Sequence, residues 1–216
     1  MHLAVFDLDH TLLAADSDYL WGQFLCDQGL VDREHYETRN RQFYADYAAG
    51  QLDVDAFYRF SLAPLMLKSL DEWEPLRRRF LEEQIRPSVA RQAPQLLARH
   101  RDQGDLLLIT TATQRFITEP IAEMLGVEHL LASEPEIAEG RFTGRLRRAN
   151  FQAAKVSGLQ TWLRERAITP RSITAYSDSR NDIPLLELAD RPVAVDPDPT
   201  LRAHAETKGW PVISLR

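Results

Sequence analysis

Short apolar runs alternate with longer amphipathic segments along most of the chain. Five buried strands are predicted by the apolar runs at residues 3–8, 106–110, 172–177, 192–195 and 211–215. Most of these runs are nearly continuous, which is typical of parallel strands covered on both faces. Helical spacing separates most of them, at residues 88–100, 114–125, 153–166, 182–189 and 200–208. This order predicts an α/β fold with a doubly wound parallel sheet.

The segment between the first two strands follows a different pattern. Residues 14–88 contain no strand pattern but four helical segments, at 18–28, 32–49, 53–68 and 71–85, with Pro64 as a predicted break in the third. A crossover of about 75 residues is far longer than an ordinary connection. We therefore predict two domains, an α/β core of residues 1–13 and 89–216 and an all-helical cap of residues 14–88. Ligands of open α/β sheets bind at the carboxyl edge of the strands, where we expect the cap to lie.

A smaller insertion interrupts the second half of the core. The sequence EIAEGRFTGRL at residues 136–146 carries two glycines between short apolar stretches, which predicts a β-hairpin. The basic run at residues 145–148 then falls on a solvated hairpin edge.

Composition and charge exclude several classes of partner and site. The net charge of −6 argues against nucleic acid or an anionic membrane surface, both of which attract basic proteins. Cys26 is the single cysteine, so the chain forms neither an internal disulfide nor a cysteine zinc site. The sequence shows no signal-like start and no apolar window of membrane-spanning length. We expect a cytoplasmic protein that is a monomer or a homodimer.

Polar residues that could take part in catalysis or ligand binding follow the ends of the predicted core strands. The first strand ends in VFDLDHT, which places Asp7 and Asp9 directly after a buried run. Thr110 and Thr111 end the second strand, and Asp178 follows the third. Lys155 and Asp182 lie on the helices before and after that third strand. Parallel strands end at one edge of the sheet, so we expect these groups to converge there.

Each of these residues also has a purely structural interpretation. Asp9 could cap a turn, and Thr111 and Thr113 could cap the next helix. Asp182 fits a capping pattern with Ser179, and a lone lysine such as Lys155 is usually solvated. Two acids directly after a buried strand are not explained by capping, because burial costs each of them free energy and they repel one another.

Magnesium and a phosphoryl group account for this set of side chains together. Carboxylate ligands without histidine or cysteine suit Mg²⁺, which binds one or two carboxylates and leaves places for water and phosphate. A lysine, a hydroxyl and backbone N–H groups can hold the transferring phosphoryl group. One aspartate can attack phosphorus while the other exchanges protons with the leaving oxygen and the water.

The order of the motifs resembles a known family. VFDLDHT, a strand ending in threonine, Lys155 and SDSRND at residues 177–182 resemble the four motifs of haloacid dehalogenase (HAD) superfamily phosphatases. The helical insertion after the first motif and the EGRFTG hairpin resemble subfamily IB, the branch of phosphoserine phosphatases and histidinol phosphatases. The resemblance implies a HAD-like Rossmannoid core with a C1-type cap and a Mg²⁺-dependent hydrolase of small phosphate esters.

The resemblance also implies a role for each matching residue. Asp7 would be the nucleophile and a metal ligand, and Asp9 the general acid/base whose backbone carbonyl binds the metal. Asp178 would be the third metal ligand, and Lys155 would neutralise the nucleophile and the phosphate.

Four further residues would support phosphate and metal binding. The Thr111 hydroxyl and the Ala112 amide would hold the phosphoryl oxygens, with Thr110 as the alternative if the alignment slips by one residue. Asn181 and Asp182 would orient the phosphate, the metal-bound waters and Lys155.

The substrate stays open between two amino-bearing esters. Asp16 falls where phosphoserine phosphatases place an acid for the substrate amine. Their arginine for the substrate carboxylate falls near Ser61 here, and Arg59 lies two residues away. Their serine–glycine–glycine motif is replaced by the sequence Thr-Ala-Thr at residues 111–113. Without the arginine, an ester that lacks a carboxylate, such as histidinol phosphate, becomes a candidate beside phosphoserine.

Two other functions share this type of fold. A phospho-accepting signalling or binding module also uses an acid cluster, a threonine and a lysine, but needs neither Asp9 nor a cap. A dehalogenase of the family lacks the second aspartate of the first motif and needs no metal. The absence of a GxxxxGK pattern excludes a P-loop nucleotidase.

Overall fold

A mostly parallel sheet organises the chain, and it confirms the predicted α/β class. The computed structural model describes residues 1–216 apart from the side chain of Ala48. The strands of the sheet are β1 (His2–Phe6), β2 (Leu106–Gln114), β3 (His129–Ala138), β4 (Arg141–Arg148), β5 (Ser172–Ser177), β6 (Arg191–Val195) and β7 (Val212–Ile213). They lie in the order β4-β3-β2-β1-β5-β6-β7, and β1 runs parallel to both β2 and β5 at the centre.

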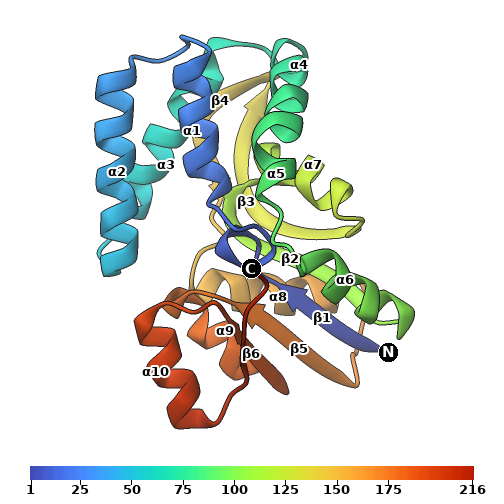
Figure 1. Cartoon of the computed structure of the whole chain (residues 1–216). Helices are drawn as coiled ribbons and strands as arrows, with labels where there is room; N and C mark the ends of the chain where they lie inside the picture. The colour runs from blue at the N-terminus through green and yellow to red at the C-terminus, as the bar shows by residue number, and fades with distance from the viewer.

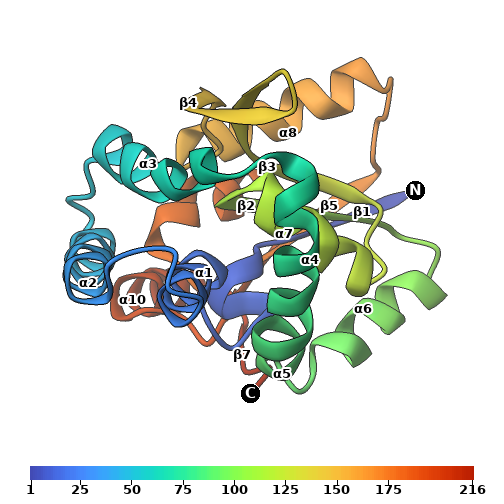
Figure 2. The same ribbon diagram turned by 90° about the horizontal axis from the view of Figure 1, so that it is seen from above.

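Helices cover both faces of this sheet, as the continuous apolar strands predict (Figure 2). The core helices are α6 (Ala93–Asp102), α7 (Arg115–Met124), α8 (Ala153–Glu165), α9 (Ile183–Leu188) and α10 (Pro199–Lys208). Alternate residues of β1 point to opposite faces. Leu3 and Val5 pack with apolar residues of α8, α9 and α10, whereas Ala4 and Phe6 pack with those of α6 and α7. None of the described helices is long and apolar enough to cross a membrane.

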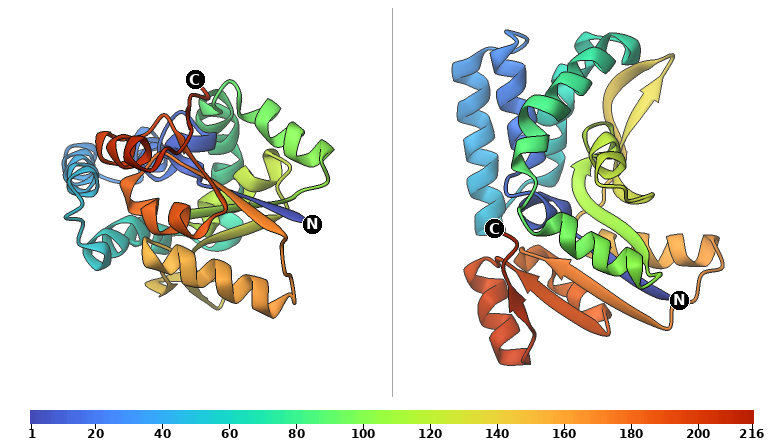
Figure 3. Two further views of the ribbon diagram at one scale, coloured as in Figure 1. Left: turned by 90° about the horizontal axis from the view of Figure 1, so that it is seen from below. Right: turned by 45° about the vertical axis from the view of Figure 1, so that its right-hand side comes forward.

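The segment between β1 and β2 is helical, as predicted, and stands over the carboxyl ends of the parallel strands (Figures 1 and 3). Its elements are α1 (Ser17–Asp27), α2 (Arg33–Ala49), α3 (Val54–Leu62), the 3₁₀ turn Ala63–Leu67, α4 (Leu70–Phe80), the π-type turn Leu81–Ile85 and α5 (Arg86–Ser88). Pro64 lies in the 3₁₀ turn, so the expected break after α3 is present. Leu13 and Val89 pair across the two connections to the core. The division into separate domains at residues 14 and 88 stays a prediction.

Two boundaries differ from the sequence-based expectation. A helix was expected from residue 88, but α6 begins at Ala93, because Ala90 donates its N–H to Leu12 (2.9 Å) and Gln92 to Leu215 (2.9 Å). The hairpin is longer than residues 136–146. The first part of β3 pairs in parallel with β2, and only its second part forms the hairpin with β4.

A buried aromatic cluster joins the inserted helices to the core. The indole of Trp21 on α1 lies 5.7 Å from Trp73 and 5.0 Å from Phe80, both on α4. It also lies 5.9 Å from Phe116 on α7, measured between ring centroids. Edge-to-face and tilted contacts at these distances add to the hydrophobic contribution of burial. The cluster therefore fixes α1 and α4 against one face of the core.

Replacing Trp21 by alanine should lower the free energy of unfolding by about 3–5 kcal/mol, because the ring leaves a cavity shared by three helices. Urea denaturation followed by circular dichroism measures the change. Leu67→Ala is the control: Leu67 is 58% exposed, and its loss should change stability by less than about 0.5 kcal/mol. A loss below about 1 kcal/mol in Trp21→Ala would contradict the role of the cluster.

Candidate active site

The first motif forms a tight turn at the carboxyl end of β1. Asp7 directly follows the strand, and the chain reverses over Leu8–Leu12. His10 adopts a left-handed conformation with φ of 58°, which is uncommon for a residue with a side chain. Arg216 donates hydrogen bonds to the carbonyls of His10 (3.0 Å) and Leu13 (3.3 Å). These contacts hold the turn that carries both acids.

Lys155 joins two of the predicted acids. Its ammonium nitrogen lies 2.7 Å from Asp7 Oδ1 and 2.7 Å from Asp182 Oδ2, and all three side chains are buried. The Ser177 hydroxyl also donates to Asp182 Oδ2 (2.8 Å). Burial alone would lower the pKa of Lys155, but the carboxylates of Asp182 and Asp7 raise it above its usual range. The lysine is therefore an ammonium group and a fixed positive charge at the site.

Asp7 and Asp178 share one hydrogen-bond donor. The Thr11 hydroxyl lies 3.3 Å from Asp7 Oδ2 and 3.2 Å from Asp178 Oδ1, and its single proton serves one of them at a time. Burial raises the pKa of Asp7 to about 7, against the lowering effect of Lys155, and Asp182 and Asp9 add to the rise. Burial and the charges of Asp7 and Asp182 also raise the pKa of Asp178. This excess of carboxylate oxygen over donors fits a hard cation such as Mg²⁺.

The Asp9 carboxylate turns toward the end of β2. It accepts hydrogen bonds from the Ser17 amide (2.7 Å) and from the hydroxyls of Thr113 (2.9 Å) and Thr111 (3.2 Å). The alternative that Thr111 and Thr113 cap the next helix is wrong, because α7 begins after Gln114 without a side-chain cap. Thr111 also fits the predicted phosphate-binding position better than Thr110 does. The Thr110 hydroxyl accepts a hydrogen bond from Asn150 (3.0 Å) in the buried interior.

A pocket opens between these residues and the inserted helices. Its lining consists of Asp7, Asp9, His10, Asp16, Asp18, Tyr19, Asn40, Phe43, Tyr44, Tyr47, Leu52, Val54, Phe57, Tyr58, Thr111, Ala112, Thr113, Phe151, Lys155 and Asp178. Five of these residues are aspartates, and Lys155 is the one lysine or arginine among them. The lining includes most of the predicted site and brings together more carboxyl groups than cationic groups.

Asp16 lines the same pocket, and its role toward a substrate amine stays a prediction. Its carboxylate caps α1 by accepting from the Tyr19 amide (2.8 Å), and it also lines the pocket. Burial and the charge of Asp9 raise its pKa to about 7, against the effect of the backbone hydrogen bonds.

Several of the residues considered from the sequence lie outside the pocket lining, including Asp182, which contacts Lys155 from behind it. The Asn181 amide oxygen accepts from Gln152 Nε2 (3.0 Å), so its side chain faces the start of α8. Arg59 is exposed on α3 and Ser61 is buried, and neither lines the pocket. The described lining of the pocket thus contains no arginine for a substrate carboxylate.

Two tyrosines of the inserted helices were missed by sequence reasoning. Tyr47 on α2 donates to Ser179 Oγ (3.2 Å), and Tyr58 on α3 donates to the Ala112 carbonyl (2.9 Å). Tyr58 also shares a 2.6 Å hydrogen bond with the Ser133 hydroxyl. These contacts connect the inserted helices to the loop after β5 and to the last residues of β2. Thr11 was missed too, although it belongs to the quoted motif VFDLDHT.

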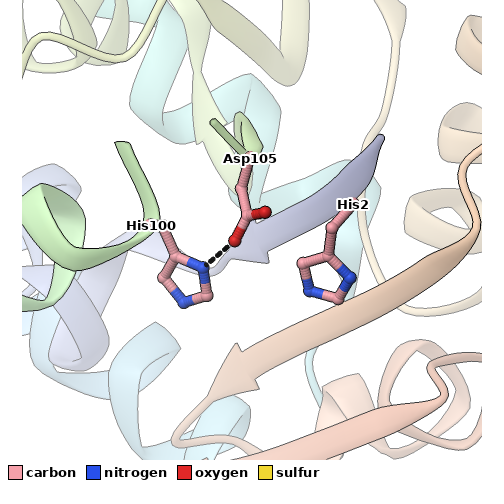
Figure 4. A group of neighbouring side chains, drawn as sticks. All are labelled: His2, His100 and Asp105. Carbon is pink, nitrogen blue, oxygen red and sulfur yellow. Dashed lines mark hydrogen bonds and ion pairs between the residues drawn. The ribbon is translucent and has the colours of Figure 1, made fainter. Parts of the chain in front are cut away.

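A second polar cluster lies at the opposite end of the sheet (Figure 4). Ligand atoms of His2, His100 and Asp105 lie within 4.8 Å of one another, the one such group of three among the described residues. The His2 ring is bonded to Ser172 and Thr174, and the His100 ring to Asp105 (2.7 Å) and Tyr176 (2.8 Å). Both nitrogens of each ring therefore already have a protein partner. We interpret the cluster as a hydrogen-bond network that joins β1, β5 and α6.

Comparison with known proteins identifies the family. The model of haloacid dehalogenase-like hydrolases matches residues 4–187. The chain belongs to this family. Its predicted membership and its class as a hydrolase are thereby confirmed.

Several relatives of this haloacid dehalogenase-like hydrolase carry phosphatase names. It is 40% identical to a histidinol-phosphatase of Neisseria meningitidis over 100% of this chain and 99% of that protein. It is 31% identical to a phosphoserine phosphatase of Mycobacterium tuberculosis, over 99% of this chain and 70% of that one.

Solved structures share the fold over the whole chain. A Bordetella pertussis protein of unknown function superposes with a TM-score of 0.94 at 40% identity, covering 100% of this chain and 99% of that one. A substrate-bound phosphoserine phosphatase superposes with a TM-score of 0.72 at 17% identity, covering 99% of this chain and 92% of that one. The second likeness shows a common fold, including the helical insertion.

The metal-free enzyme should lose stability as the pH rises from about 5 to about 8. Asp7 has a folded pKa of about 7, against ~3.9 in an unfolded chain, so the folded state binds more protons in this range. By linkage, the free energy of unfolding then falls with rising pH, and Asp7 contributes about 2–3 kcal/mol of the change. Urea titrations in EDTA at several pH values measure it. In Asp7→Asn the free energy of unfolding should fall less steeply with pH. An increase in wild-type stability with pH would contradict the raised pKa of Asp7.

Proposed function

We propose that this hydrolase is a Mg²⁺-dependent phosphomonoesterase that acts on a small amino-bearing phosphate ester through an aspartyl-phosphate on Asp7. The observation that carries the proposal is the buried contact of Asp7 with Lys155, beside Asp178 and facing a pocket that Thr111 also lines. Phosphatase names among the relatives support the reaction class.

The side chains divide the reaction between them. An Asp7 oxygen attacks phosphorus, and the bond from phosphorus to the ester oxygen breaks as Asp9 gives that oxygen a proton. Asp9 then takes a proton from water, the water oxygen attacks phosphorus, and the bond to Asp7 breaks. The product alcohol and inorganic phosphate leave, and both aspartates return to their initial states.

The donors around Asp9 also serve the substrate. The Thr111 hydroxyl bonds to Asp9 in the ligand-free enzyme, and it turns to a phosphoryl oxygen when the ester binds. This rotation removes one of the two hydroxyl donors from Asp9 Oδ2, where Thr113 still donates, and leaves a position on that oxygen for a proton. Lys155 holds the Asp7 oxygen and balances the phosphate charge, and Asp182 keeps the lysine in place. The Ala112 amide is the second hydrogen-bond donor to the phosphate. Asn181 lies behind the pocket lining, where its side-chain oxygen accepts a hydrogen bond from Gln152.

The metal site uses the oxygen atoms left without donors. Asp7 and Asp178 would hold Mg²⁺ by their carboxylates, and Asp9 by its backbone carbonyl, because its side chain is bonded to Ser17, Thr111 and Thr113. When bound, Mg²⁺ supplies positive charge that stabilises the transferring phosphoryl group.

The charge of the pocket favours histidinol phosphate over phosphoserine. Asp16 and Asp18 face the substrate with carboxylates, and the described lining offers no arginine for a substrate carboxylate. A cationic ester without a carboxylate therefore matches the pocket better. The 40% identical relative named histidinol-phosphatase supports the same choice.

Asp7→Asn should reduce phosphate release by at least about 10³-fold, because an amide is too weak a nucleophile to attack phosphorus. The assay uses histidinol phosphate, phosphoserine, phosphoethanolamine and p-nitrophenyl phosphate, and wild-type kcat/KM should be highest for histidinol phosphate. Circular dichroism controls for folding. Full turnover in Asp7→Asn would exclude Asp7 as nucleophile, and a preference for phosphoserine would exclude the substrate assignment.

Removal of the metal with EDTA should abolish activity, and Mg²⁺ should restore it. Mg²⁺ should also raise the melting temperature of the chelated enzyme more at pH 8 than at pH 5, because protonated carboxylates bind the cation poorly. Asp178→Asn should lose both effects. Hydrolysis that persists in EDTA, or a Mg²⁺ shift that is equal in Asp178→Asn, would contradict the proposed metal site.

A further inference from the structure

The inner end of the pocket holds two polar side chains without partners. Asp18 on α1 and Asn40 on α2 are 9% and 5% exposed, and both line the pocket. Among the described residues, neither side chain takes part in a hydrogen bond or an ion pair, whereas Asp16 accepts from Tyr19 and Asp9 from three donors. Their polar atoms are not among the fully enclosed unpaired atoms of the described residues, so they face the open space of the pocket and are available to bond to a ligand there.

The surroundings of Asp18 make its burial costly. Burial is the main cause of its raised pKa, and the charges of Asp16 and Asp9 add to it, with no opposing cation. Asp18 lies in the first turn of α1, where the helix dipole favours an acid. The helix dipole favours an acid in the first turn even at an exposed position, and Asp55 in the first turn of α3 is an exposed example. The dipole therefore does not explain why Asp18 is buried.

Close contact of α1 and α2 brings the two side chains to the same end of the pocket. The helices lie side by side in Figures 1 and 2. Gly22 lies one turn after Asp18, and a Cβ atom there would come within 2.9 Å of Asn40 Nδ2. Gly22 thus lets α2 approach α1 closely enough for Asn40 to reach the pocket.

Aromatic and aliphatic residues form the rest of this end. Phe43 on α2 and Phe57 on α3 contact each other at 5.6 Å, and both line the pocket with Leu52 and Val54. A ligand group that fits here is flat and apolar on its faces and carries N–H groups at its edge. A protonated or neutral nitrogen heteroaromatic ring, such as imidazole, has these properties.

We propose that Asp18 and Asn40 form a subsite for a nitrogen heteroaromatic group of the substrate, separate from the amine that faces Asp16. The Asp18 carboxylate accepts from one ring nitrogen, and the Asn40 amide bonds to the other. This inference rests on the proposed function for its place in the reaction, because the phosphate must lie at Asp7 for the ring to reach Asp18. Asp18 on α1 and Asn40 on α2 would then determine specificity for the ring.

Binding and hydrolysis by Asp18→Asn test the subsite together. The Kd of histidinol, measured by calorimetry, should rise about tenfold or more, because a charged hydrogen bond to the ring is lost. KM for histidinol phosphate should rise by a similar factor. For phosphoethanolamine, which carries the amine but no ring, kcat/KM should change less than about twofold. Asp55→Asn, the exposed first-turn control, should leave all of these values unchanged.

Thermal stability separates a ligand-binding role from a structural one. Asp18→Asn should raise the melting temperature of the ligand-free enzyme by about 2–4 °C, because folding otherwise requires Asp18 either to stay charged in the pocket or to bind a proton, and both cost free energy. A lower melting temperature would show that Asp18 stabilises the fold and would overturn the proposal.

Two outcomes distinguish the failure of the subsite from that of the proposed function. Equal histidinol affinity in wild type and Asp18→Asn, or no binding by wild type, overturns the subsite even if every phosphate ester is hydrolysed. If wild type hydrolyses no ester, the proposed function fails. Loss of histidinol binding in Asp18→Asn would then still support the subsite, because calorimetry does not depend on turnover.

Discussion

The buried Lys155 ammonium between Asp7 and Asp182 is the contact on which the site depends. It joins the end of β1, the start of α8 and the turn after β5, three segments that are distant in sequence. Burying these charges is unfavourable unless they are paired, so removal of any one leaves an uncompensated charge in the interior. Asp178 and Asp9 add further negative charge at the same edge. One lysine does not balance four carboxylates, and the proposed cation with its phosphate ligand would correct the remaining imbalance.

The inserted helices contact this centre in two different ways. On one side, Trp21 and its aromatic neighbours pack α1 and α4 tightly against α7. On the other side, α2 reaches the core through the Tyr47 hydroxyl on Ser179 and through Gly50, which packs against the Arg180 guanidinium. Breaking the Tyr47 hydroxyl contact and moving the exposed end of α2 costs less free energy than separating a buried aromatic cluster. Opening of the pocket toward α2 therefore needs no disruption of the core.

The sequence predicts the parts of the site that follow from strand position. Asp7, Asp9, Thr111 and Asp178 stand at the ends of apolar runs, and a parallel sheet brings such ends together whatever the intervening chain does. Asp18 and Asn40 have no such marker, since a polar residue on an amphipathic helix normally faces solvent. Their burial depends on how α1 and α2 pack, which Gly22 permits but no periodicity reveals. The His2 and His100 network was missed for the same reason, because its members come from separate elements.

Charge also explains how one fold could separate similar substrates. A carboxylate on the substrate would face Asp16 and Asp18 without a compensating arginine among the described lining residues, and like charges in a partly dehydrated pocket repel strongly. An amine and a ring nitrogen would face the same two acids favourably. Selection against the wrong ester would then come from repulsion as much as from attraction to the right one. The burial that raises the pKa of Asp18 is unfavourable in the free enzyme, and in the proposed subsite this same property would make Asp18 selective for a ligand that brings a donor.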